Sequence, residues 1–139
     1  MIQSIRESRA DAVEARKQAE RKVEMLRATL DRAKLTLKAA QSRRDEFLDQ
    51  EQALAEKQNE LYQHCNSDPN HPTAFEATIN KYADQQLAVA EKRARAQEVV
   101  SDRQRAVEDA QIELLGAERA LQRANRQLNE FNARPLTSD

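Results

Sequence analysis

The sequence predicts an all-α fold in which two long helices form an antiparallel coiled-coil hairpin. Residues at alternating steps of three and four are mostly apolar from Ile2 to Cys65 and again from Phe75 to Phe131, at 14 of 19 and 14 of 17 positions. We call each of these stripes a seam. Seams this long are typical of a left-handed coiled coil. Only a short segment separates them, and a short connection between long helices favours antiparallel neighbours.

The first helix is expected at about residues 2–65, a stretch that contains neither glycine nor proline. It should end in a turn at residues 66–73. This segment is rich in turn-forming residues, and its two prolines, Pro69 and Pro72, cannot continue a helix.

The second helix is expected at about residues 74–133. Thr73 and Glu76 have the spacing of a capping box, in which each side chain accepts a hydrogen bond from the backbone amide of the other residue. At the far end Pro135 disfavours a helical conformation at the preceding residue, which leaves a short tail at residues 134–139.

The two seams should pair as mirror images about Asn70. In this register large residues face small ones in most layers near the termini, which permits close approach of the helices. The pairs are Val23 with Ala117, Leu26 with Leu114, Leu30 with Ala110, Ala33 with Val107, Ala40 with Val100, Ala19 with Leu121 and Ala12 with Leu128. The complementarity favours a monomeric hairpin, although an extended parallel dimer could use the same seam residues.

The middle of the hairpin is expected to be the softest part, because polar residues interrupt the seams there. The mirror register places Arg44, Phe47, Glu51 and Leu54 opposite Ala96, Arg93, Val89 and Gln86. This stretch is either a tolerated solvated layer or a bend or partner site.

Composition limits the function classes. Charged residues make up 34% and aromatic residues 4% of the 139 residues, which suits long helices in a single domain, residues 1–139. The net charge of −1 gives no general attraction to nucleic acid or anionic membranes. No apolar run is long enough for membrane insertion and no signal peptide is apparent, so we expect a cytoplasmic protein.

The sequence offers no catalytic motif. It has no glycine-rich phosphate loop and no plausible Ser/His/Asp arrangement, so we expect no enzyme activity and no cofactor. Cysteine and histidine are zinc ligands, and one cluster near the turn contains both. Its members are His64, Cys65, Asp68 and His71. Their spacing matches no established zinc motif, so we expect a simple loop without metal.

Two short motifs resemble a known family. They are Met1-Ile2-x-x-Ile5-Arg6 at the start and Leu128-Asn129-Glu130-Phe131 near the end. With the hairpin and the basic start of the chain, they resemble the small coiled-coil stalk proteins of type III secretion systems, flagellar FliJ and injectisome proteins of the YscO type. The resemblance extends over the whole chain in architecture. The turn at residues 68–72 matches no pattern of the family.

The resemblance implies a non-enzymatic central-stalk or adaptor protein at the cytoplasmic face of a flagellar or injectisome export apparatus. Its partners would be the hexameric export ATPase, the export gate and export chaperones. The terminal end of the hairpin would approach the ATPase ring. The residues of this chain that match that end are Ile2, Ile5, Arg6, Arg9, Phe131 and Arg134. The alternatives are a rod-shaped chaperone and a structural spacer arm in another complex.

Overall fold

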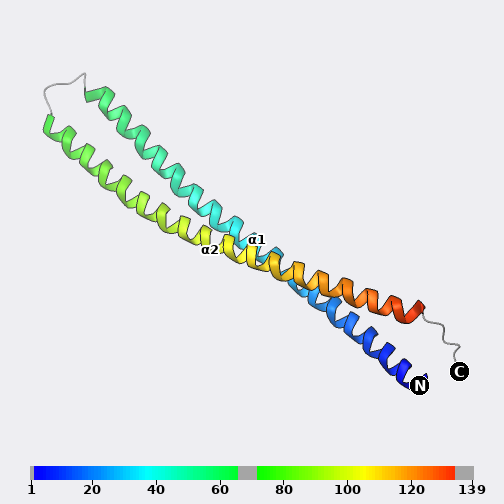
Figure 1. The fold of residues 1–139 in the computed structure, drawn as a ribbon. Helices are drawn as coiled ribbons and strands as arrows, with labels where there is room; N and C mark the ends of the chain where they lie inside the picture. The colour runs from blue at the N-terminus through cyan, green and yellow to red at the C-terminus, as the bar shows by residue number, and fades with distance from the viewer. Residues whose placement is uncertain (1, 66–71, 134–139) are drawn as a thin grey trace. The chain divides into compact units, whose positions relative to one another are not determined.

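A computed structural model describes residues 2–65 and 72–133, with side chains described within 6–64 and 76–133. All the described residues are helical. Helix α1 is Ile2–Cys65 and helix α2 is Pro72–Ala133, of 64 and 62 residues. The two helices pack against each other in opposite directions (Figure 1). The all-α antiparallel coiled-coil hairpin predicted from the sequence is therefore confirmed.

Helix α2 begins two residues earlier than expected. Its first residue is Pro72, and Thr73 lies inside the helix. Proline suits the first helical position because the amide hydrogen that it lacks would have no partner within the helix. The side chain of Thr73 lies outside the described side chains, so the capping box with Glu76 stays a prediction. The rest of the expected turn, residues 66–71, and the tail 134–139 lie outside the described residues.

The buried core lies entirely on the predicted seams. Every buried residue among the described side chains is apolar and occupies a seam position. These residues are Ala12, Val23, Leu26, Leu30 and Ala40 in α1, and Ala96, Val100, Val107, Ala110, Ala117 and Leu128 in α2. Four of the predicted mirror pairs have both members in this set. The 3–4 spacing thus identified the residues that the two helices bury.

The hairpin divides into two compact units, each containing part of both helices. Unit 1 comprises Met1–Leu35 and Arg105–Asp139, and unit 2 comprises Thr36–Gln104. In unit 1, Val23, Leu26 and Ala117 form one core cluster, against which Leu114 and Leu121 pack. Val23 with Ala117 and Leu26 with Leu114 are mirror pairs of the predicted register.

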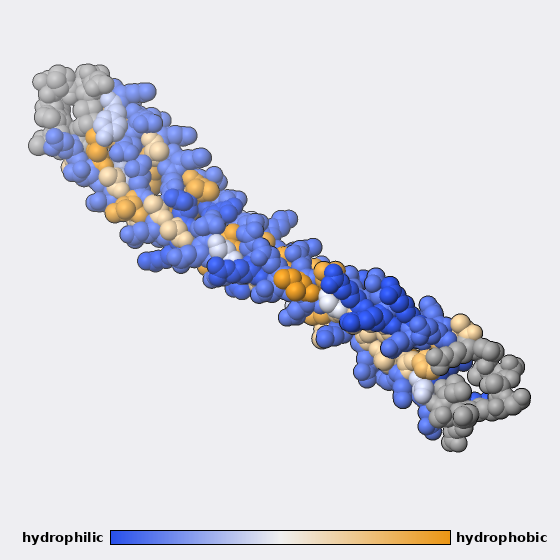
Figure 2. All heavy atoms as spheres, in the orientation of Figure 1, coloured by the Kyte–Doolittle hydropathy of each residue, from blue (hydrophilic) through white to orange (hydrophobic). Residues whose placement is uncertain are grey.

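The remaining apolar surface is scattered. The large apolar side chains that stay exposed lie off the seams, and they are Met25, Leu35, Leu48, Tyr62, Leu87, Val99, Ile112 and Leu115. Figure 2 shows hydrophilic side chains over most of the visible face, with apolar side chains between them. Single exposed apolar residues are common on protein surfaces, so none of them marks a site by itself.

Candidate partner-binding surfaces

The terminal end of unit 1 contains three of the predicted binding residues in described positions. Arg6 and Arg9 of α1 are both exposed, whereas Phe131 of α2 is half-buried. The guanidinium groups can therefore meet a partner without displacing core packing. Arginine offers a planar fork of donors that matches a carboxylate, which suits it to protein interfaces.

The other three predicted residues lie outside the described side chains. Ile2 and Ile5 belong to the backbone of α1, but their side chains are not described. Arg134 follows the last residue of α2, Ala133, and lies outside the described chain. In the mirror register the two isoleucines would lie beyond the end of the second seam at Phe131, and this stays a prediction.

A shallow groove of about 460 Å³ lies between the helices at this end. Phe131, Ala12 and Ala15 give it an apolar floor, and Asp11 and Glu130 border it. The sequence predicted Phe131 as an apolar seam residue but gave no indication of the acidic border. The two arginines are not among the residues that line this groove. The terminal end thus presents exposed cations on α1 and a separate, acidic apolar groove.

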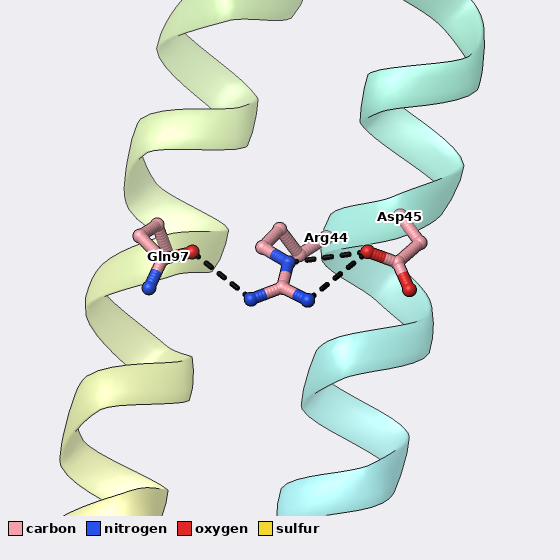
Figure 3. Close-up of polar contacts among 3 residues, drawn as sticks. All are labelled: Arg44, Asp45 and Gln97. Atoms are coloured by element: carbon pink, nitrogen blue, oxygen red, sulfur yellow. Dashed lines mark hydrogen bonds and ion pairs between the residues drawn. The ribbon is translucent and has the colours of Figure 1, made fainter.

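In unit 2 the polar seam residues make contacts between the helices. Arg44 of α1 donates a hydrogen bond of 3.2 Å from Nη1 to Oε1 of Gln97 in α2 (Figure 3). Its Nε and Nη2 atoms lie 3.2 and 3.1 Å from Oδ1 of Asp45. The Arg44 guanidinium is therefore held by both helices. The mirror register had placed this side chain opposite Ala96, one residue away from the partner that it finds.

A second interhelical contact in unit 2 joins two seam residues. Nε of Arg93 lies 2.8 Å from Oε1 of Glu51, with side chains 40% and 23% exposed. The register paired Glu51 with Val89 and Arg93 with Phe47, so it missed this ion pair. Arginine is long enough to reach one helical turn along the partner helix. The sequence did contain a signal for this ion pair, because residues of opposite charge occupy seam positions one helical turn out of the mirror register.

The described residues offer little for metal or membrane chemistry. Among them no group of three or more His, Cys, Asp and Glu side chains could hold a metal ion. Of the His/Cys cluster near the turn, only the His64 side chain is described, and it is exposed; Cys65, Asp68 and His71 lie outside the described side chains. Within the described part of the chain, neither helix has an apolar stretch that could cross a membrane.

The fold and these surfaces were compared with known proteins. No protein-family model, no curated protein and no solved structure matches this chain.

Proposed function

We propose that this chain is a non-enzymatic stalk or adaptor protein of a type III secretion export apparatus, and that the terminal end of the hairpin binds the export ATPase. The observation that supports this most directly is the pair of exposed arginines, Arg6 and Arg9, at the end of the hairpin where α1 begins and α2 ends. The short motifs at both ends of the sequence, which resemble those of the stalk proteins, support the same end.

The physical basis is the chemistry of the arginines. A carboxylate of a partner can pair with each guanidinium through two parallel hydrogen bonds. Arginine and aromatic residues are also enriched among the residues that contribute most to protein–protein binding. We therefore place Arg6 and Arg9 in the contact with the ATPase ring, together with Phe131 at the same end of the hairpin. The export gate and export chaperones would be further partners of the same protein.

Binding to a purified export ATPase tests the proposal. Biolayer interferometry and the rate of ATP hydrolysis would be measured with the wild-type chain and with the variant Arg6→Glu/Arg9→Glu. We expect at least about a tenfold loss of affinity, because both attractions become repulsions. The control Lys34→Glu/Lys38→Glu makes the same charge change at two exposed positions of α1 away from this end. It should leave affinity within about twofold.

Two results would contradict this proposal, and a third would favour the chaperone alternative. A wild-type chain that neither binds the ATPase nor changes its hydrolysis rate would overturn the proposal. Equal losses in the two variants would show a general charge effect and would overturn the role of the two arginines. Suppression of aggregation of an unfolded client protein, without ATPase binding, would instead support the chaperone alternative.

A further inference from the structure

A groove between α1 and α2 in unit 2 combines an apolar floor with a polar border whose charged residues are all basic. It consists of two adjoining hollows of about 410 and 400 Å³ that share Lys92 as a lining residue. The larger floor residues are Phe47 and Leu54 from α1 with Val89 and Val99 from α2. The first three are half-buried and Val99 is 46% exposed, so the floor keeps apolar surface in contact with water.

The charges of the groove differ from those of its surroundings. Its charged residues are Arg43, Lys57, Lys92 and Arg95, and no carboxylate lines it. Yet residues 36–104 contain 12 Asp and Glu against 9 Lys and Arg. Although acidic residues are in excess in this unit, four of its nine cationic side chains and none of its carboxylates line this groove.

These four cationic side chains can also pair with charged groups of a partner. Among the described residues none of them forms an ion pair, whereas Arg44 and Arg93 of the same unit do. The Arg43 guanidinium lies 5.7 Å from the centre of the Phe47 ring, a distance that allows a cation–π contact. That contact orients the guanidinium over the apolar floor without neutralising its charge.

The grooves of unit 1 provide an internal comparison. One is bordered by Lys22 and Glu113, so its charges balance. The other is bordered by Asp11 and Glu130 and contains no cation. A basic border is therefore not a general result of coiled-coil patterning in this chain. Among these grooves of the described residues, the basic border belongs to the one in unit 2.

We propose that this groove binds one helix of a partner protein, a helix with an apolar stripe flanked by acidic residues. A third helix fits the surface between two packed helices, where its apolar stripe would cover the floor. Its carboxylates would meet the four cations on either side. From Ala40 to Lys57 the groove extends over about 17 residues of α1, or about 26 Å, so the bound segment spans roughly five helical turns.

A nucleic acid is a poorer occupant than an acidic helix. The negative balance of residues 36–104 repels a polyanion beyond the groove itself. The apolar floor would also stay uncovered beneath a phosphate backbone. This inference concerns unit 2 alone and does not depend on the proposed role in secretion, which concerns the terminal end of unit 1.

The test uses a fluorescent peptide of about 18 residues, designed as an amphipathic helix with a leucine stripe flanked by glutamates. A matched peptide has glutamine in place of every glutamate. Fluorescence anisotropy with the full chain should show saturable binding of the acidic peptide that weakens as salt is raised. The glutamine peptide should bind at least about tenfold more weakly.

Charge variants of the chain test whether the acidic peptide binds in this groove. Lys57→Glu/Lys92→Glu should weaken the acidic peptide at least about tenfold, whereas Lys34→Glu/Lys38→Glu should leave its affinity within about twofold. Circular dichroism checks that both variants are helical. If the first variant is unfolded, the neutral Lys57→Gln/Lys92→Gln replaces it and should still weaken binding several-fold, by about half the effect on a logarithmic scale.

Several outcomes would overturn the proposal. These are no saturable binding, equal binding of the two peptides, and equal losses in the groove and control variants. Tighter binding to phosphatidylglycerol vesicles than to the peptide would identify a membrane surface as the occupant. Self-association in sedimentation that disappears in Lys57→Glu/Lys92→Glu would identify a second copy of this chain.

Discussion

Truncation of Leu26 is the sharpest test of the core of unit 1. This residue is 8% exposed and belongs to the cluster with Val23 and Ala117. The change Leu26→Ala should lower the free energy of unfolding because it removes apolar atoms from the middle of the seam. Met25, the preceding residue, is 61% exposed and provides a control at the same place along α1.

The expected loss in the free energy of unfolding follows from how deeply the Leu26 side chain is buried. Leucine to alanine removes roughly three CH₂-sized groups, each worth about 0.8 kcal/mol when buried, for a transfer loss of about 2.4 kcal/mol. With Leu26 only 8% exposed, nearly all of this loss applies. Any cavity that the neighbours do not fill adds to it, so we expect about 2–3 kcal/mol. Met25→Ala should change the free energy of unfolding by less than about 0.5 kcal/mol.

Urea unfolding followed by circular dichroism at the helical minimum measures both variants. With a slope of about 1.5 kcal/mol per molar urea, the Leu26→Ala midpoint should fall by more than about 1 M. Equal midpoints for the two variants would refute the assignment of Leu26 to the buried seam. A midpoint that rises with protein concentration would refute the intrachain hairpin, because only an intermolecular coil depends on concentration.

Three further changes test the register and the helices. Cysteines introduced at Ala33 and Val107, in a background without the native cysteine, should form a disulfide readily. A partner cysteine one heptad from Val107, about 10 Å along α2, should not form one. Titration of free thiols distinguishes the two results. A double-mutant cycle of Glu51→Gln and Arg93→Gln should give a coupling of about 0.5–1 kcal/mol, since partial exposure screens the pair; no coupling would contradict the contact. Gly116→Ala should raise stability by about 0.5–1 kcal/mol, because alanine has the higher helix propensity and its methyl group would meet no atom of the partner helix within 4 Å; a lower melting temperature would contradict this.

The fold was predictable because one local signal determines it. A strict repeat of three and four places the same side chains on one stripe of a helix, whatever surrounds them. The repeat therefore identified the residues that become buried, such as Val23 and Val100, each 2% exposed. The mirror register also predicted the pairing of Val23 with Ala117, which lie in one cluster, because so few residues separate the two seams in the sequence.

The polar contacts were less predictable because long side chains do not obey the layer geometry. Arg93 reaches Glu51 one turn away from its mirror partner, and Arg44 reaches Gln97 beside its own. A register predicts where Cβ atoms face each other, and an arginine tip can lie several ångströms from that point. The start of α2 was expected about two residues too late for a different reason. Proline was taken as a helix breaker, although the first turn of a helix tolerates it.

Three large seam residues of unit 2 are covered less fully than the most buried leucines of unit 1. In unit 1 the large seam residues Leu26 and Leu128 are buried against the partner helix. In unit 2 the large residues Phe47, Leu54 and Val89 stay half-buried beside the basic groove. Burial of this remaining surface by a third helix would stabilise unit 2 in proportion to the apolar area covered. In unit 2 the polar seam residues and the basic groove thus occur together, beside large apolar side chains that the two helices leave half-buried.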